Sequence, residues 1–467
     1  MIIEQIYTGC LFQASYYIES NGESAIIDPI REVDLYIAKA RNNNSKIKYV
    51  FETHFHADFV SGHLTLSKKT NSKIIFGPNA KPNYECIIAN DNDEFTIGDL
   101  TVKVLHTPGH TLESVTYLLK DSDGKDYCIF TGDTLFLGDV GRPDLAQVNA
   151  EVNPEIQAGM LFDSIQNKIL VLDDDVIVYP AHGAGSACGK NMMKITFDSL
   201  GNQKKLNYAL NSKLTKPEFI EKVLDGLQKP PQYFPENVKL NKEGYEDIDK
   251  ILSSSKKLLK ANKFEEIANE NRALVLDVRS KEEYENSHGP RSIFIGLDGG
   301  FAPWVGELII DIKTPILLVC NESQIEEAVT RLSRVGFDNT LGYITIDKWK
   351  ENGKEIDSIN SISAVETVKR LENKSSILID VRKENEYKSQ HVVNAHNYQL
   401  SSINNYLPKF DEKNDYYIHC QSGYRSMIAC SILKSRGIHN ITNVIGGFKN
   451  LGLTTLNLSN KICPSKL

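Results

Sequence analysis

Short apolar runs, each followed by polar residues and glycines, dominate residues 1–200 of the chain. The clearest are rich in β-branched and aromatic residues and have the length of buried strands: SAIIDPI, IKYVFETH, SKIIFG, LTVKVLHTPGH, YCIFTGDTLF and VIVYPAHG. Helices fit the segments 34–42, 62–70 and 154–169. This alternation predicts an N-terminal α/β domain of the αββα type.

The second half of the chain contains an internal repeat. The segment LVLDVRSKEEYENSHGPRS (274–292) resembles ILIDVRKENEYKSQHVVNA (377–395) without a gap. Four residues recur 103 positions later: Asp277, Arg279, Tyr284 and His288 return as Asp380, Arg382, Tyr387 and His391. Each copy starts with a β-branched run that suits a buried parallel strand, and helical segments follow. The repeat therefore predicts two small α/β domains with parallel sheets.

A chain of 467 residues has room for about three domains of roughly 150 residues each. The proline-containing segment 229–241 ends the first domain, and a polar, lysine-rich helix over 245–261 is expected to lead into the repeats. We predict an α/β multidomain chain with domains at 1–245, 246–357 and 358–467.

Composition and charge narrow the class of protein. Lys and Arg number 53 against 61 Asp and Glu, and the net charge of −8 argues against a nucleic-acid or anionic-membrane partner. No apolar run approaches the ~18 residues that would span a bilayer, and the N-terminus lacks the features of a secretory leader. Eight Cys are too few for a disulfide framework. We expect a reduced, cytoplasmic protein.

Histidines and aspartates gather behind the predicted strands of the first domain. The candidates are His54, His56 and Asp58 in THFHAD, His110 in TPGH, Asp133 in TGDT and His182 in PAHG. Because each follows an apolar run, one sheet edge can bring them together. Imidazole and carboxylate ligands suit zinc or Fe(II) better than magnesium or calcium. Loop capping and core hydrogen bonding are the alternative roles, but so many such residues at strand ends favour a metal site.

The second repeat carries a candidate reactive thiol between a predicted strand and a predicted helix. Cys420 is followed by Gly423, Arg425 and Ser426 in HCQSGYRS. Backbone N–H groups, the helix N-terminus and the arginine favour a thiolate at that position, and the glycine permits a tight loop. The alternative is a buried, inert cysteine.

The corresponding loop of the first repeat lacks this chemistry. It reads CNESQIEE from Cys320 and contains neither glycine nor arginine, and it places glutamates where an anion would need positive charge. Carboxylates raise the pKa of a nearby thiol and repel an anionic sulfur. We expect Cys320 to end a core strand and this domain to be inactive.

The first-domain motifs resemble the metallo-β-lactamase superfamily, whose fold is an αββα sandwich. The usual superfamily motif is HxHxDH, and its last His helps to hold a second metal; here Phe59 occupies that position. A phenyl ring cannot ligate a metal, so the resemblance points away from the binuclear hydrolases.

One branch of the superfamily fits better. ETHFHADFVSG and TGDTLFLGDVGRPDL resemble the persulfide dioxygenases of the ethylmalonic encephalopathy protein type. This resemblance implies one mononuclear Fe(2+) site. Its implied ligands are His54, His110 and Asp133, with His56, Asp58 and His182 around them as orienting residues.

Two further residues enter through this resemblance. Arg142 in GRPD matches the arginine with which that family contacts substrate, although a structural salt bridge is the alternative. Cys188 in GAGSACGK lies six positions after His182 and is a candidate to contact the substrate sulfur, or else a small buried thiol. Glutathione-using members have His-Asp-Tyr where this chain has His-Gly-Ala, which departs from a glutathione persulfide site.

The CxxGxRS pattern resembles the rhodanese sulfurtransferases, which carry a persulfide on this cysteine. Related phosphatases on the same fold have a longer loop. The resemblance implies that Cys420 and Arg425 act on sulfur, that Gly423 and Ser426 bind substrate, and that the first repeat is a degenerate rhodanese-like domain.

Together the resemblances imply oxidation of a small-molecule persulfide by O2 to a thiol and sulfite, coupled to sulfane-sulfur exchange between persulfide and sulfite or thiosulfate. They also imply a homo-oligomer. Two alternatives stay open: a zinc thioester hydrolase of the glyoxalase II type fused to a sulfurtransferase, and a non-enzymatic sulfur carrier.

Overall fold

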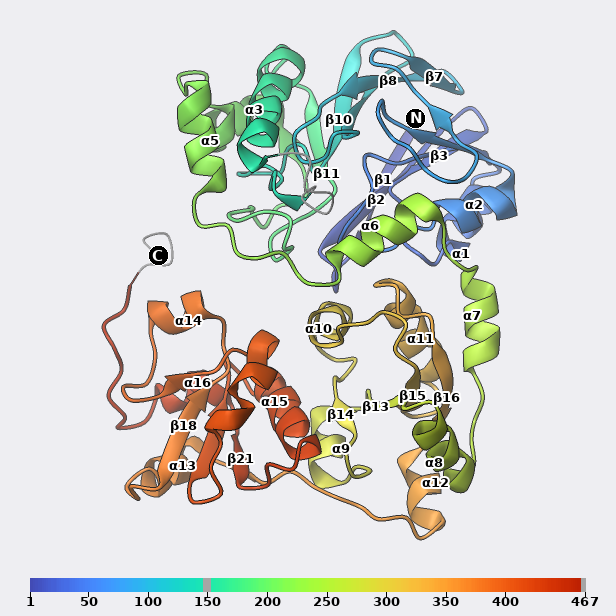
Figure 1. The fold of residues 1–467 in the computed structure, drawn as a ribbon. Helices are drawn as coiled ribbons and strands as arrows, with labels where there is room; N and C mark the ends of the chain where they lie inside the picture. The colour runs from blue at the N-terminus through green and yellow to red at the C-terminus, as the bar shows by residue number, and fades with distance from the viewer. Residues whose placement is uncertain (146–152, 463–467) are drawn as a thin grey trace. The chain divides into compact units, whose positions relative to one another are not determined.

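The computed structural model describes residues 1–145 and 153–462. The chain folds into two compact units (Figure 1). The first comprises Met1–Lys250, Ile310–Ile312 and Thr330–Asp338, and the second comprises Ile251–Ile309, Lys313–Val329 and Asn339–Leu467. None of the described helices combines the length and the apolar character that crossing a bilayer requires. The domain boundaries at 245 and 357 stay predictions.

The first unit contains two six-stranded sheets. One follows the order of the sequence: β1 (Ile2–Thr8), β2 (Gln13–Ser20), β3 (Glu23–Ile27), β4 (Lys46–Phe51), β5 (Lys73–Phe76) and β6 (Ile87–Ile88). The other has the order β12-β11-β10-β9-β8-β7: β7 (Glu94–Ile97), β8 (Leu100–His106), β9 (Val115–Lys120), β10 (Asp126–Gly132), β11 (Ile177–Pro180) and β12 (Asp198–Ser199). The apolar runs predicted as strands are confirmed as β3, β4, β5, β8, β10 and β11.

Helices and apolar side chains complete this α/β unit. The two sheets share a core in which the rings of Tyr16 and Phe130, and of Phe51 and Tyr117, pack together. A second core joins the second sheet to α3 and α5. The helices are α1 (Asp34–Asn42), α2 (His63–Thr70), α3 (Pro154–Ser164) with a π-helical turn (Ile165–Ile169), α4 (Leu200–Leu206), a 3-10 turn (Tyr208–Leu210), α5 (Lys216–Leu224) and α6 (Phe234–Glu243). The helices predicted at 34–42, 62–70 and 154–169 are confirmed.

The first repeat has a four-stranded parallel sheet in the order β14-β13-β15-β16. The central strand β15 has the sequence ILLV and is buried along its whole length, as expected when helices cover both faces of a sheet. The elements are α7 (Ile248–Ser255), α8 (Ala261–Glu270), β13 (Leu274–Asp277), α9 (Lys281–Asn286), β14 (Ile293–Phe294), α10 (Phe301–Leu308), β15 (Ile316–Val319), α11 (Ile325–Ser333), β16 (Thr340–Ile344) and α12 (Ile346–Glu351).

The second repeat has a five-stranded parallel sheet in the order β17-β21-β20-β18-β19. Its elements are β17 (Ser361–Ile362), α13 (Ala364–Arg370), β18 (Ser376–Asp380), α14 (Glu384–Ser389), β19 (His396–Asn397), a 3-10 segment (Leu400–Lys409), β20 (Asp415–His419), α15 (Tyr424–Ser435), β21 (Ile441–Val444) and α16 (Gly447–Leu451). The prediction of parallel sheets in both repeats is confirmed.

The helix predicted over 245–261 is wrong in its extent. α7 ends at Ser255, and α8 begins only at Ala261. Between them Lys257 and Leu259 exchange backbone hydrogen bonds with Tyr343 of β16, which extends the edge of the sheet by a short parallel bridge. The serines at 253–255 weaken the helix because their hydroxyls compete for backbone groups, so the pairing with the sheet edge wins.

The residues that recur between the repeats hold the fold together. Asp277 and Arg279 are buried, with 2.6 Å between Oδ2 and Nη2, and Tyr284 stacks on His288 with 3.9 Å between ring centroids. Their counterparts in the second repeat make the same ion pair at 2.6 Å and the same stack at 3.8 Å. The repeat signature is therefore explained by packing.

Replacing Arg279 by methionine should destabilise the second unit by about 3–5 kcal/mol, because it leaves the buried carboxylate of Asp277 without its partner. Both tryptophans of the chain, Trp304 and Trp349, lie in the first repeat, so their fluorescence during urea unfolding reports the change. Lys263→Ala removes only an exposed ion pair with Glu266 and is the control. A loss for Arg279→Met as small as that of the control would contradict this account.

Candidate metal centre and thiol site

Three predicted metal-site residues converge where strands of both sheets end. His54 follows β4, whereas His110 and Asp133 follow β8 and β10. The sequence favours a single sheet edge, but the structure draws these residues from two sheets. Gly132 permits the approach: its φ is +52°, and a Cβ there would lie 2.6 Å from the Thr53 side chain.

The three side chains are buried and present their donor atoms to one point. One ligating atom from each residue lies within 4.8 Å of the others. Asp133 Oδ2 lies 3.5 Å from His110 Nε2 and 3.9 Å from His54 Nε2. Among the described residues this oxygen has no hydrogen-bond partner. An unpartnered buried carboxylate oxygen that faces two imidazoles fits a metal ion, and two His with one Asp suit Fe(II) or zinc.

Hydrogen bonds on the far side of the imidazoles leave their Nε2 atoms available. His110 Nδ1 donates to the carbonyl oxygen of Arg142 at 2.8 Å. His54 Nδ1 donates to Thr53 Oγ1 at 2.9 Å, and the Thr53 hydroxyl donates to Asp28 Oδ2 at 2.9 Å. Such contacts fix the tautomer and the orientation of a ligating histidine.

The charges of the centre suit metal binding. Burial, and after it the charge of His56, lowers the pKa of His54 well below its usual value. Burial raises the pKa of the Asp133 carboxyl, but the charge and hydrogen bond of His182, with the charges of His54 and His110, hold it below its usual range. A neutral imidazole and an ionised carboxylate are the forms that bind metal.

His56 belongs to a second buried group, with Asp28 and Glu52. Its Nε2 lies 3.1 Å from Asp28 Oδ1 and 3.5 Å from Glu52 Oε2, and its ring packs against Phe59 with 4.3 Å between centroids. Asp28 also accepts a hydrogen bond from the Thr53 hydroxyl. Since Thr53 in turn contacts His54, this second group helps to orient His54 indirectly. The orienting role given to His56 by the sequence stays a prediction.

Asp58, His182 and Cys188 form a further buried group beside Asp133. His182 Nδ1 donates to Asp133 Oδ1 at 2.7 Å, and its Nε2 lies 2.8 Å from Asp58 Oδ2. Burial lowers the pKa of His182, but these two carboxylates raise it well above the usual value. Burial, followed by the charges of Asp58 and Asp133, raises the pKa of Cys188 well above its usual value, so this residue is held as the thiol.

The guanidinium of Arg142 is fully engaged within its own unit. It makes a bidentate contact with Asp144, with 2.6 Å and 2.7 Å between nitrogen and oxygen, and it also donates to the carbonyls of Ala187 and Gln228. Its exposed fraction is only 5%. This is the structural salt bridge considered as the alternative, and contact with substrate stays a prediction.

Cys420 lies in a tight loop between β20 and α15. Gly423 N donates to Cys420 Sγ at 3.1 Å, and Gly423 adopts φ +110° as the residue before the helix. The carbonyl of Cys420 accepts from Phe448 N at 2.7 Å, and a Cβ at Gly447 would lie 2.3 Å from that carbonyl oxygen. Gly423 thus lets a backbone N–H reach the sulfur, and Gly447 lets the start of α16 approach the backbone of Cys420.

The other predicted residues of this loop make contacts with the protein. Arg425 pairs with Glu386, with 2.5 Å and 2.9 Å between guanidinium nitrogens and carboxylate oxygens. The Ser426 hydroxyl donates to Asn443 Oδ1 at 2.7 Å and is buried. These contacts hold the loop, and contact of either side chain with substrate stays a prediction.

Cys320 follows β15 directly and is fully buried. Burial, and after it the charge of Asp277, raises the pKa of its thiol to about 12. The sequence predicts that the glutamates of the loop raise this pKa. In the structure the main cause of the raised pKa is burial of the thiol. A protonated thiol at this position agrees with an inactive repeat.

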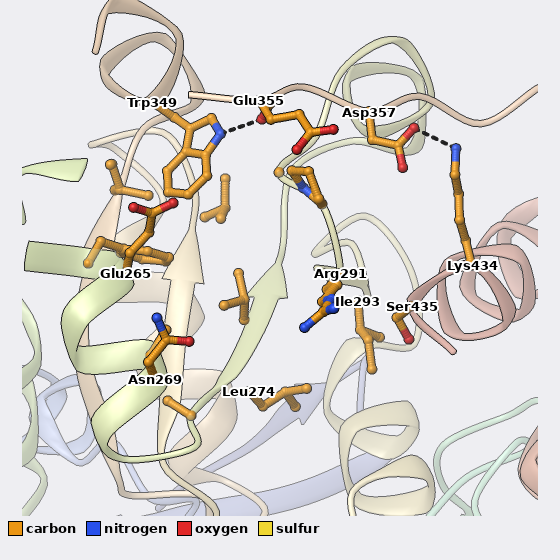
Figure 2. A pocket seen from close by; sticks show the side chains of 18 of the residues that line it. Glu265, Asn269, Leu274, Arg291, Ile293, Trp349, Glu355, Asp357, Lys434 and Ser435 are labelled. Carbon is orange, nitrogen blue, oxygen red and sulfur yellow. Dashed lines mark hydrogen bonds and ion pairs between the residues drawn. The ribbon is translucent and has the colours of Figure 1, made fainter. Parts of the chain in front are cut away.

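A separate cavity of about 930 Å³ lies between the two repeats and contains none of the predicted site residues. Figure 2 shows Trp349 on one side of it and, on the other, Lys434 paired with Asp357 at 2.6 Å. Acidic and basic side chains both line it, including Glu265 and Arg291. Because the lining carries charges of both signs, it does not indicate which class of ligand would bind in this cavity.

Two partner residues were not found from the sequence. Asp28 supports His54 through Thr53, and it could have been recognised because it follows the apolar run of β3, as the other candidates follow theirs. Glu386 pairs with Arg425 from another helix, and nothing in the local sequence indicates that pairing.

Paired sheets whose ends hold buried His and Asp define a metal-binding α/β fold, and two parallel-sheet repeats follow it. The Metallo-beta-lactamase superfamily profile matches residues 8–85, and the Rhodanese-like domain profile matches residues 260–351 and 363–452.

Individual proteins of known structure or sequence are also similar to this chain. The crystal structure of a metallo-beta-lactamase from Staphylococcus aureus subsp. aureus COL is 32% identical and covers 74% of this chain and 99% of its own, with a TM-score of 0.65. Glyoxylase B2 of Dictyostelium discoideum is 30% identical over 48% of this chain and 78% of its own length. The cytoplasmic hydroxyacylglutathione hydrolase of Arabidopsis thaliana is 35% identical over 27% of this chain, which spans 51% of that relative's length.

The chain belongs to the metallo-β-lactamase superfamily. Its N-terminal metallo-β-lactamase fold is followed by two rhodanese-like domains.

Proposed function

We propose that the chain is a non-haem iron persulfide dioxygenase joined to a sulfurtransferase. The N-terminal centre oxidises a low-molecular-weight persulfide with O2 and water to the thiol and sulfite. Cys420 accepts sulfane sulfur and passes it to sulfite, which gives thiosulfate. The observation that carries the proposal is the presence, in one chain, of a buried centre of two His and one Asp and a tight loop around Cys420.

The side chains around the metal centre support a single ion. His54, His110 and Asp133 would hold it, and Phe59 stands where the superfamily motif supplies a further His. Iron bound there supplies the redox chemistry that couples O2 to the persulfide sulfur. Hydrogen bonds from Nδ1 of each histidine keep the imidazoles in place, and full burial of the three side chains excludes bulk water.

Holding both reactions in one chain has a kinetic reason. Sulfite released by the first centre is the acceptor at Cys420, and a shared chain raises its local concentration when the two units can approach. The loop supports sulfur transfer because backbone N–H donors and a helix N-terminus stabilise an anionic sulfur.

A second candidate is a zinc thioester hydrolase fused to the sulfurtransferase. The names of the two curated relatives favour it, and so does one observation: ligating atoms of Asp58, His182 and Cys188 lie within 4.8 Å of one another beside Asp133. A second zinc there would give the binuclear centre of a hydrolase. Phe59 and the double engagement of His182 by carboxylates argue against it.

Oxygen uptake by anaerobically iron-loaded protein, measured with a panel of small persulfides, tests the proposal. We expect uptake equal to the persulfide consumed, with sulfite as product. The zinc-loaded protein with thioester substrates is the parallel measurement. Thioester hydrolysis without oxygen uptake by iron-containing protein would replace the dioxygenase with the hydrolase.

The metal content of the Asp58→Ala variant distinguishes a mononuclear centre from a binuclear one. In the proposed mononuclear centre Asp58 is not a ligand, so we expect the variant to keep about one metal ion per chain by elemental analysis. Asp133→Ala, which removes a ligand, is the matched control and should lose the ion. A wild type with two ions per chain, reduced to one in Asp58→Ala, would favour the binuclear hydrolase.

A further inference from the structure

The degenerate repeat reaches the loop of Cys420. α9 and β14 of the first repeat pack against α15 of the second, and both repeats belong to one compact unit. The Tyr424 hydroxyl donates to the carbonyl of Gly296 at 2.7 Å, and Phe294 N donates to Ser431 Oγ at 3.0 Å. A Cβ at Gly299 would lie 2.2 Å from the Tyr424 ring, so the contact is close. The helix that begins at the Cys420 loop is thus anchored on the other repeat.

This packing brings one cation of the first repeat to the mouth of the loop. Lys281 is the first residue of α9, and its Nζ lies 3.7 Å from the point where a Cβ on Gly423 would stand. Gly423 is the residue whose N–H donates to Cys420 Sγ. The ammonium group therefore stands beside the backbone that encloses the thiol.

Lys281 differs from Arg382 and Arg425, the two arginines of the second repeat that lie near the loop, in its partners. Arg382 is held by Asp380 at 2.6 Å, and Arg425 is held by Glu386 at 2.5 Å. Among the described residues Lys281 pairs with Glu282, its exposed neighbour, with 3.4 Å between nitrogen and oxygen. The charges of the two arginines are therefore neutralised by carboxylates, whereas Lys281 keeps its charge available to a ligand.

The fold of the repeat does not require a cation at this position. In the repeat alignment Lys281 corresponds to Glu384, which has the opposite charge and also begins a helix. The Lys281 side chain is 39% exposed, so it is partly open to solvent. A role in binding accounts for it better than a role in packing.

We propose that Lys281, supplied by the inactive repeat, binds the sulfur oxyanion that reacts at Cys420. This inference rests on the proposed sulfurtransferase. With thiosulfate as donor, the Cys420 thiolate attacks the outer sulfur, the sulfur–sulfur bond of thiosulfate breaks, and sulfite leaves with the bonding electron pair. One S–S bond forms as one breaks, and the total charge is unchanged. Lys281 acts on the oxyanion half of the donor, as a substrate-binding residue.

Steady-state transfer of sulfur from thiosulfate to cyanide, with the full-length protein, tests this role. We expect Lys281→Ala to raise the KM for thiosulfate about three- to tenfold with little change in kcat, because a charge-assisted contact to the substrate is lost. The KM should also depend less on ionic strength in this variant. Lys281→Arg keeps the charge and should restore most of the affinity.

Lys348→Ala is the matched control, since Lys348 has a side chain 41% exposed and a similar exposed partner, Glu322, at 3.2 Å. An unchanged KM for Lys281→Ala, in a preparation whose wild type transfers sulfur, overturns the role of Lys281 and leaves the sulfurtransferase intact. An equal rise in KM for Lys348→Ala also overturns it. A wild type that transfers no sulfur overturns the proposed sulfurtransferase together with this inference.

Discussion

Cys420→Ser should abolish sulfur transfer while leaving oxygen uptake with persulfide unchanged. Serine keeps the size of the side chain and the contact with Gly423 N, but its oxygen neither ionises near neutral pH nor accepts sulfane sulfur. We expect a loss of about a thousandfold or more in thiosulfate:cyanide transfer. The product of the coupled reaction should change from thiosulfate to sulfite.

Cys320→Ser is the matched control, because Cys320 holds the corresponding position in the first repeat. We expect this variant to transfer sulfur at the rate of the wild type. Mass spectrometry after exposure to thiosulfate should find an added sulfur atom on Cys420 and none on Cys320. Thiosulfate production that persists in Cys420→Ser would show that the two reactions are not coupled through this residue.

His110→Ala should remove both the metal and the oxygen uptake. The side chain is buried, and its Nε2 faces the unpartnered oxygen of Asp133, so the substitution removes one of the three ligating atoms of the centre. We expect metal content near zero by elemental analysis and a loss of at least about a hundredfold in oxygen uptake. Sulfur transfer at Cys420 should survive, since that loop belongs to the other unit.

His106→Gln is the control for this variant. His106 lies at the end of the same strand, β8, but its ring contacts the carbonyl of Leu112 at 3.0 Å, which a glutamine amide can also reach. It should retain metal and oxygen uptake. Full metal content in His110→Ala would remove this residue from the ligand set.

The strands could be predicted from the sequence where a short run of apolar residues shows that the segment is buried. β-Branched runs such as the ILLV of β15 indicate strands because few other structures bury every side chain in succession. The helix over 245–261 could not be predicted correctly, because its interruption depends on Tyr343, which is far along the chain. Local propensity is a weak guide where an unpaired sheet edge competes for the backbone.

The candidate sites divide in the same way. His54, His110 and Asp133 were found because each stands directly behind an apolar run, and strand ends meet in space. Arg142 and Arg425 were recognised by their motifs, but the carboxylates that hold them come from contacts that no motif describes. Whether an arginine is free to bind substrate therefore depends on the carboxylates that the whole fold places beside it.

The anchoring of α15 on the first repeat has a consequence for how this unit comes apart. Opening the first repeat would break the hydrogen bond from Tyr424 to Gly296 at the start of α15 and the one from Phe294 N to Ser431 in the middle of this helix. We therefore expect the two copies to open together in hydrogen exchange, so that slow exchange in α15 depends on the first repeat as well as on its own domain. The first repeat then belongs to the same folding unit as the loop of Cys420.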